Sequence, residues 1–209
     1  MKDLLLLVAD ADMEAFFSGI LQRPKAIQIR PITYEIQRHP LRDSGIIQSG
    51  AELARMRKGN FHKVILLWDH HGSGCEKRYS ADDSAKAMQD KLDSYTWKTH
   101  SHTVSIDPEL EIWLWHTESS IRKCWNLSEQ QMELWIAEIA ASLNRSIENA
   151  KKEVPKELFE FLIKEKVRRT ISPRNFAQIG NSASMPALLK CDSFRAIIET
   201  LRRWFPPVK

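Results

Sequence analysis

The sequence predicts an α/β fold: a mostly parallel four-stranded sheet flanked by helices, with a C-terminal helical subdomain. Short apolar segments alternate with segments of helical periodicity, an order that is typical of a parallel sheet covered by helices. One of these segments, residues 64–67, is an unbroken run of Val, Ile and Leu. Such a run suits a strand that is buried on both faces. The chain has 209 residues, which is enough to bury a sizeable core.

The first sixty residues predict two strands and two helices. Residues 3–9, DLLLLVA, predict a strand that leads into an acidic segment, where we expect Asp12 to cap a helix. Residues 25–37 alternate apolar and polar side chains and predict a second, bent strand. Residues 39–50 are rich in turn formers, and we expect a short helix over residues 51–58 to follow them.

The apolar run at residues 64–67 predicts the third strand, and a glycine-containing loop follows it. Residues 84–95 carry apolar side chains at helical spacing, and residues 100–106 predict the fourth strand. Residues 107–115 begin with Asp and Pro, which predicts a helix that starts directly after this strand. Its two tryptophans, Trp113 and Trp115, are not expected to be buried together.

Beyond residue 127 the periodicity is wholly helical. We therefore divide the chain into an α/β domain over residues 1–127 and a helical C-terminal subdomain over residues 128–209 that packs on it. Four helices are expected in the second part, over residues 128–144, 155–169, 176–179 and 193–205.

The net charge of +4 lies entirely in the second part, because residues 1–127 hold 17 Lys and Arg against 17 Asp and Glu. A mild basic excess permits a nucleic-acid partner without requiring one, and a solvated helical surface is the more usual explanation. Three widely spaced cysteines form no zinc or disulfide pattern and indicate a cytoplasmic protein. The early apolar run at residues 4–9 is too short to span a membrane, so no membrane partner is expected.

Acidic side chains follow three of the predicted strands. Asp10 comes after the first strand, Asp69 and His71 after the third, and Glu111 after the fourth. Ligands of open α/β sheets bind outside the carboxyl ends of the strands, so we expect a site there. Clustered carboxylates repel one another, and a bound divalent cation would offset the repulsion. Oxygen ligands favour Mg²⁺ or Mn²⁺, and the imidazole of His71 shifts the preference toward Mn²⁺.

Two further acids have simpler explanations. Asp12 is better explained as a helix cap than as a ligand. Glu14 lies in the first turn of a helix, where the helix dipole alone favours an acid, and a functional role is equally open.

Two segments of the chain resemble TOPRIM-like proteins. VADADMEAFF, residues 8–17, is similar to the opening of that fold, in which a strand ends in a Glu-Gly pair and a second Glu follows four residues later; Asp10 and Glu14 take the places of the two acids. VILLWDHH, residues 64–71, resembles the strand that carries the family's Asp-x-Asp, with Asp69 and His71 at the two positions. Asp at position 10 and His at position 71 are departures from the family pattern.

The likeness extends to the C-terminal part. PELEIWLW, residues 108–115, resembles the Glu-x-Trp-Leu segment of small TOPRIM-like families found with RloB-type and abortive-infection systems, and Glu111 takes the place of its acid. Residues 176–204 are similar to the end of the same families. The resemblance therefore covers nearly the whole chain.

This resemblance implies a metal-dependent phosphoryl-transfer site. Asp10 and Glu14 would be catalytic, and Asp69, His71 and Glu111 would hold Mg²⁺ or Mn²⁺. The first hypothesis is a nuclease or nuclease-like subunit of a bacterial anti-phage system, resembling a small component of methylation-associated defence systems. The alternative is a catalytically degenerate TOPRIM module that binds nucleic acid or protein within a defence complex.

Expected partners are DNA or RNA and other proteins of a defence operon, and a homo-oligomer is left open. Basic residues of the C-terminal helices, above all Arg168, Arg169 and Arg174, are expected to form a wall over the site and to bind nucleic acid. Arg174 and Arg195 lie near predicted helix starts, where the helix dipole disfavours a cation unless an anion compensates.

Overall fold

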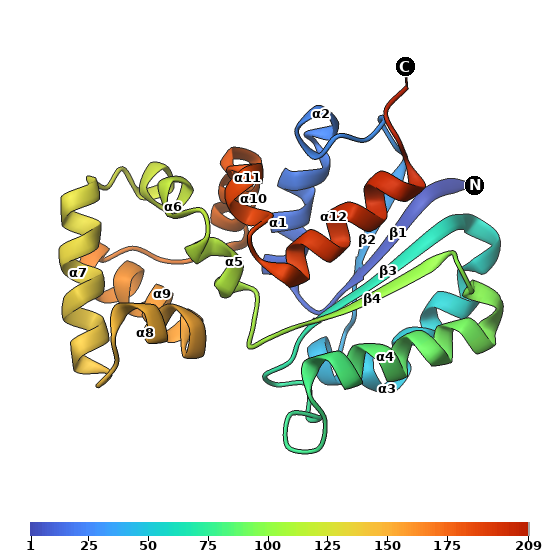
Figure 1. Ribbon diagram of the computed structural model, residues 1–209, viewed down its shortest axis with the longest axis horizontal. Coiled ribbons are helices and arrows are strands. Elements are labelled where there is room, and N and C mark those ends of the chain that lie inside the picture. Colours follow the sequence, from blue (N-terminus) through green and yellow to red (C-terminus); the bar gives the residue numbers. More distant parts are fainter. Residues whose placement is uncertain (209) are drawn as a thin grey trace.

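A computed structural model describes residues 1–208 of the chain. Its centre is a four-stranded sheet in the order β2-β1-β3-β4, with every neighbouring pair parallel (Figure 1). The predicted α/β class and parallel sheet are therefore confirmed. The strands are β1 (Lys2–Val8), β2 (Tyr34–Arg38), β3 (Phe61–Asp69) and β4 (Ser101–Ile106).

Helices cover both faces of the sheet. One face carries α3 (Arg42–Met56) and α4 (Ala81–Leu92), and the other carries α1 (Ala11–Leu21) and α12 (Asp192–Trp204) (Figure 1). A further helix, α10 (Pro173–Ser182), packs along α1. Because both faces are covered, residues 4–8 of β1 are almost completely shielded from solvent, as the apolar sequence of such a strand requires.

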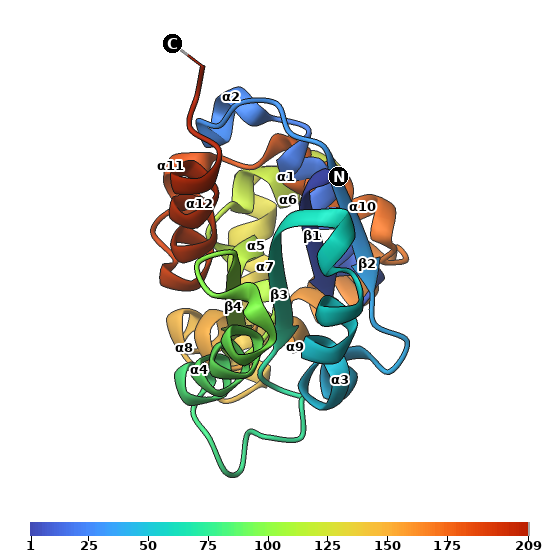
Figure 2. The same cartoon turned by 90° about the vertical axis from the view of Figure 1, so that its right-hand side faces the viewer.

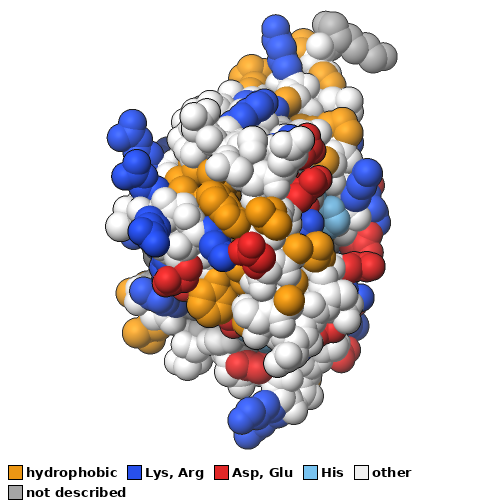
Figure 3. Space-filling model, turned by 90° about the vertical axis from the view of Figure 1, so that its left-hand side faces the viewer, with side chains coloured by type: hydrophobic (Ala, Val, Ile, Leu, Met, Phe, Trp, Pro, Cys, Tyr) orange, Lys and Arg blue, Asp and Glu red, His pale blue; other side chains and the backbone are white. Residues whose placement is uncertain are grey.

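The remaining helices gather beyond the carboxyl ends of the strands, on the left of Figure 1. Figure 3 looks onto this end, where apolar side chains lie among charged ones. The main helices here are α5 (Glu111–Trp115), α6 (Glu118–Trp125), α7 (Glu129–Ser142), α8 (Ile147–Glu153) and α9 (Pro155–Phe161) with its continuation η3 (Leu162–Val167). The short elements elsewhere are α2 (Pro24–Ile27), η1 (Lys58–Asn60), η2 (Asp93–Trp97) and α11 (Met185–Leu188).

The helices that follow residue 127 lie in two different places. Helices α7 to α9 stand at the end of the sheet, whereas α10 and α12 return to the α/β layers. The division at residue 127 stays a prediction. Within residues 1–208, no helix is long and apolar enough to cross a membrane.

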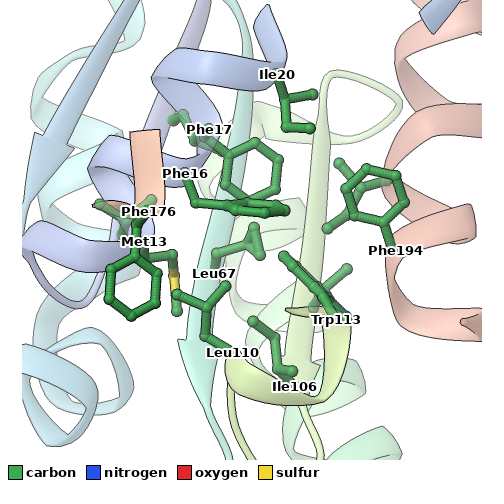
Figure 4. Packing of buried hydrophobic residues seen from close by; sticks show 14 of the residues in the cluster. Met13, Phe16, Phe17, Ile20, Leu67, Ile106, Leu110, Trp113, Phe176 and Phe194 are labelled. Carbon is green, nitrogen blue, oxygen red and sulfur yellow. The ribbon is translucent and has the colours of Figure 1, made fainter. Parts of the chain in front are cut away.

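An aromatic cluster joins three helices to the core (Figure 4). The ring of Trp113 from α5 lies 5.7 Å from Phe17 of α1 and 5.3 Å from Phe194 of α12, in edge-to-face arrangements between ring centroids. Phe16 packs 5.9 Å from both Phe17 and Trp113. Edge-to-face aromatic pairs add about 0.5 to 1.5 kcal/mol beyond the burial of their area. The cluster therefore holds α5, which begins at Glu111, firmly against the sheet.

Two glycines allow α1 and α10 to cross at backbone distance. A Cβ atom at Gly19 would lie 2.5 Å from the Ala177 carbonyl oxygen, and a Cβ atom at Gly180 would overlap the Phe16 carbonyl oxygen. Only glycine fits at such a close approach. Arg23 then donates from Nη1 to the carbonyl oxygens of Gly180 and Ala183 across this crossing.

Two predicted boundaries are wrong in the first half of the chain. Helix α3 spans Arg42–Met56, although residues 39–50 were expected to be a turn and only 51–58 a helix. The glycines of this segment imitate a turn, but Gly50 serves packing, because a Cβ atom there would lie 3.1 Å from Leu66. Residues 25–37 do not form one strand: they divide between the short helix α2 and strand β2.

The segment after β4 also differs from the prediction. Helix α5 begins at Glu111, so Asp107 is not its cap. Residues 107–110 instead lie against the end of β3, where Pro108 accepts a hydrogen bond from the His71 backbone N–H and Leu110 donates one to Asp69. Trp113 and Trp115 are both buried, contrary to expectation, because α9 covers the second side of α5. Trp115 donates its Nε1–H to the Pro155 carbonyl oxygen at 2.9 Å.

Candidate functional site

Carboxylates from several elements meet at the carboxyl end of the sheet. Asp10 follows β1, Asp69 ends β3, and Glu111 begins α5 just after β4. Asp69 has four acidic neighbours whose charges raise its pKa: Glu111, Asp43, Asp10 and Glu109. We call the whole group the acidic cluster: Asp10, Asp12, Asp43, Asp69, Glu109 and Glu111.

Asp10 has a structural task as well as a place in the acidic cluster. It is the N-cap of α1, and its Oδ1 accepts hydrogen bonds from the backbone N–H groups of Asp12 at 3.1 Å and Met13 at 2.9 Å. The expectation that Asp12 is the cap is therefore wrong. Asp12 lies in the first turn instead, where burial and the neighbouring charge of Asp10 raise its pKa to about 6.

Asp69 is held rigidly and kept away from water. Its side chain is buried, and its Oδ1 accepts a hydrogen bond from the Leu110 backbone N–H at 2.9 Å. Its own backbone N–H donates to Asp43 Oδ1 at 2.8 Å. Burial, followed by the charges of Glu111 and Asp43, raises the pKa of Asp69 well above its usual value.

Glu111 lies deeper still. Only 6% of its surface is exposed, and its Oε2 has no hydrogen-bond partner among residues 1–208. Burial raises the pKa of Glu111 to about 8, because the loss of water outweighs the opposing charge of Lys156. A buried polar atom without a partner is rare, and it is often explained by a ligand, a water or an ion.

Lys156 is the cation of this site. It lies in the first turn of α9, and its Nζ is 3.8 Å from Glu109 Oε2. Burial opposes its charge, but the carboxylates of Glu111, Glu109 and Asp69 outweigh burial and raise the pKa of Lys156. Lys156 therefore stays charged and offsets part of the negative charge of the acidic cluster.

The other predicted metal ligand is placed differently. His71 is exposed on the loop after β3, and its backbone N–H donates to the Pro108 carbonyl oxygen at 3.0 Å. Its charge reaches Glu109, so it lies at the rim of the acidic cluster rather than within it.

The second predicted catalytic acid has an ion-pair partner. Glu14 Oε2 lies 3.0 Å from Arg38 Nε, and both side chains are partly exposed. Asp10, Glu14, Arg38 and Arg42 line a pocket of about 520 Å³ at the ends of β1 and β2. Glu14 therefore faces this pocket and is separated from the buried acids Asp69 and Glu111.

The predicted nucleic-acid-binding arginines lie on the surface. Arg168 ends η3, Arg169 follows it, and Arg174 is in the first turn of α10; all three are exposed. In the described part of the chain, none of them lies within 4.0 Å of an Asp or Glu oxygen. Arg195 does have an acidic partner, Asp192, in the same helix.

The chemistry of the acidic cluster fits a hard divalent cation. Its donors are carboxylate oxygens, which Mg²⁺ and Mn²⁺ prefer, and Glu111 Oε2 has no other partner. Over residues 1–208, no three His, Cys, Asp or Glu side chains converge on one point as they stand. Binding therefore requires the side chain of Glu111 to turn toward an ion that it shares with Asp69.

The sequence did not single out Asp43, Glu109 or Lys156. Asp43 was hidden in the segment interpreted as a turn. Lys156 carried a usable signal: it follows Pro155 in the first turn of a helix, where a cation is disfavoured unless an anion compensates. The same signal is present at Arg174 and Arg195, near the starts of other helices.

Comparison of the chain with protein-family models, with curated proteins and with solved structures finds no match.

Proposed function

We propose that the acidic cluster is the site of a metal-dependent phosphodiesterase that acts on nucleic acid. The main supporting observation is the pair of buried carboxylates, Asp69 and Glu111, at the carboxyl end of a parallel sheet. Burying an ionised carboxylate without compensation is strongly unfavourable, and a bound cation supplies that compensation. The resemblance to small TOPRIM-like families supports the same activity and suggests a role in a bacterial anti-phage system, together with other proteins of its operon.

Each side chain has a part in this proposal. Asp69 and Glu111 would hold Mg²⁺ or Mn²⁺, with His71 at the rim as a further ligand. A divalent cation in this position stabilises the negative charge that develops on a phosphoryl group. Lys156 adds a second positive charge next to the same position.

Asp10 is the candidate for the proton of the attacking water or of the leaving group. Its two capping bonds both go to Oδ1, so the geometry of the cap fixes the carboxylate while leaving Oδ2 for this task. Glu14 would act from the neighbouring pocket, after its ion pair with Arg38 opens.

A second candidate function has its own support. Lys156 already neutralises part of the acidic cluster, and Arg38 already neutralises Glu14. Both contacts suit a degenerate site that binds a partner protein or nucleic acid without cleaving it.

Cleavage assays separate the two candidates. Plasmid DNA, single-stranded DNA and RNA are incubated with the protein in Mg²⁺, in Mn²⁺ and in EDTA. Asp69→Asn removes a buried charge of the site, and Asp82→Asn removes an exposed charge in the first turn of α4. We expect metal-dependent cleavage by the wild type and by Asp82→Asn, and a loss of at least about 100-fold in Asp69→Asn. Absence of cleavage with every substrate and metal would favour the binding module.

A further inference from the structure

The amino ends of β3 and β4 carry a concentration of positive charge, at the opposite end of the sheet from the acidic cluster. Figure 2 looks onto this end, where the start of β3, the start of β4 and the end of α12 come together. We call this group the amino-end patch: Lys58, His62, Lys63, His100, His102 and Arg203. It is separate from the arginines around residues 168–174.

Lys63 is at the centre of the amino-end patch. Its Nζ lies 3.0 Å from His100 Nδ1 and 5.1 Å from the centroid of the Trp204 ring. Lys58 sits 4.0 Å above the ring of Trp97 and donates from Nζ to the Thr96 carbonyl oxygen at 2.5 Å. These contacts hold both ammonium groups in place on a partly apolar surface.

The amino-end patch has no acidic partner in residues 1–208. None of its members lies within 4.0 Å of an Asp or Glu oxygen, although ion pairs are frequent elsewhere on the surface. Burial, and then the charges of Arg203 and Lys58, lower the pKa of Lys63. Burial and the charge of Arg203 lower the pKa of His102 to about 4. His102 is therefore uncharged at neutral pH, and the cations of the patch are Lys58, Lys63 and Arg203. An anion bound among these three cations would offset their mutual repulsion.

Ordinary structural reasons explain only part of this arrangement. Arg203 lies in the last turn of α12, where the helix dipole favours a cation by about 0.3 to 1 kcal/mol. The aromatic rings beneath Lys58 and Lys63 contribute about 0.5 to 1 kcal/mol each at exposed sites. Neither effect brings the cations of η1, β3 and α12 together on one surface.

We propose that the amino-end patch binds the phosphate backbone of a nucleic acid, independently of the acidic cluster. A backbone offers a series of phosphates, and several cations from different elements can contact such a series at once. His62 near the start of β3 and Asp69 at its end are separated by seven residues, so the two sites are roughly 23 Å apart along the strand. The same nucleic acid could therefore contact both ends of the sheet only by passing along the molecule.

The test compares two triple variants with the same change of net charge. The first is Lys58→Glu, Lys63→Glu and Arg203→Glu. The control is Lys25→Glu, Lys77→Glu and Lys123→Glu, which alters exposed lysines that make no ion pair within the described residues. Binding is measured by fluorescence anisotropy in EDTA, so that cleavage by the acidic cluster does not enter. The probes are single-stranded DNA, duplex DNA, RNA and polyglutamate.

We expect the patch variant to bind the best nucleic-acid probe at least 30-fold more weakly than wild type, and the control to stay within about 3-fold. The slope of log affinity against log salt should fall by about 2 to 3 for duplex DNA, since each lost phosphate contact removes about 0.9. A second patch variant replaces the same residues by glutamine: Lys58→Gln, Lys63→Gln and Arg203→Gln. It should weaken binding at least 5-fold. Its urea unfolding should match that of the wild type, which excludes a folding defect as the cause.

Three results would overturn the proposal. One is equal binding by wild type and both patch variants. Another is an equal loss in the control, which would assign the effect to net charge alone. The third is binding of polyglutamate as tight as that of any nucleic acid, which would point to an acidic protein partner.

Discussion

At the scale of single residues, Glu111 combines burial with an unpartnered carboxylate oxygen. Burial opposes the charged form of this carboxylate and raises its pKa to about 8, whereas the amide of Gln carries no charge. We therefore predict that Glu111→Gln raises the free energy of unfolding by roughly 1 to 3 kcal/mol at pH 8.5 in EDTA, measured with urea. The exposed residue Glu133 provides the control, and Glu133→Gln should change stability by less than about 0.5 kcal/mol. A destabilised Glu111→Gln would mean that the carboxylate already has a favourable partner.

His71 sets the expected metal preference. Imidazole nitrogen is a poor ligand for Mg²⁺ and an acceptable one for Mn²⁺, so the wild type should bind Mn²⁺ more tightly than Mg²⁺. In His71→Ala, calorimetric titration should show this difference reduced, whereas His62→Ala, at the other end of the sheet, should leave it unchanged. Tighter binding of Mg²⁺, or an unchanged preference in His71→Ala, would remove His71 from the ligands.

His102 makes stability depend on pH. Its folded pKa of about 4 lies below the ordinary value of 6.5, because burial opposes the charged form. The unfolded chain therefore binds a proton first as pH falls, and the stabilisation present above pH 6.5 is lost progressively toward pH 4. Lowering the pH from 7.5 to 5 should cost the wild type about 1 to 2 kcal/mol more than His102→Gln, measured by urea unfolding. The comparison with the variant is essential, because the raised pKa values of Asp12 and Glu111 act in the opposite direction. An identical pH dependence in the two proteins would contradict this assignment.

At the scale of elements, the crossing of α1 and α10 depends on glycine. A Cβ atom at Gly180 would overlap the backbone of Phe16, which cannot move without shifting α1. Gly180→Ala should therefore lower the free energy of unfolding by about 2 to 4 kcal/mol. Gly59→Ala is the matched control, because a Cβ atom at Gly59 meets nothing within 4 Å. Thermal unfolding of the two variants tests the prediction, and equal melting temperatures would show that the crossing tolerates a side chain.

The elements that the sequence predicted correctly are those in which apolar periodicity and burial agree. The run of residues 64–67 is completely buried, as expected of such a strand, and helix α7 lies within the expected residues 128–144. The first part of helix α3, up to residue 50, was missed because its glycines serve packing rather than a turn, and a single sequence does not distinguish the two uses.

The sequence predicted only part of the candidate site, because some of its residues come together only through the packing of distant elements. Asp10, Asp69 and Glu111 follow strands, so strand order alone brings them together. Lys156 comes from a helix more than forty residues beyond Glu111 in the chain, and only the packing of α9 against α5 places it at the same end. No local pattern contains that information.

At the scale of the whole molecule, charge is separated along the strands. The acidic cluster occupies the carboxyl end of the sheet, and the amino-end patch occupies the opposite end. The net charge of +4 does not reveal this separation, because the α/β part of the chain is balanced in sequence. In the two proposals, a nucleic-acid backbone would contact the amino-end patch directly, but would reach the acidic cluster only together with a divalent cation.

The central claim is that the acidic cluster holds a divalent cation. Isothermal titration calorimetry with Mn²⁺ at pH 7.5 tests it on the wild type, on Asp69→Asn and on the exposed control Asp82→Asn. We predict saturable binding to the wild type and to Asp82→Asn, and a loss of affinity of at least about 10-fold in Asp69→Asn. Equal affinity in all three proteins, or no binding to any of them, would contradict the claim.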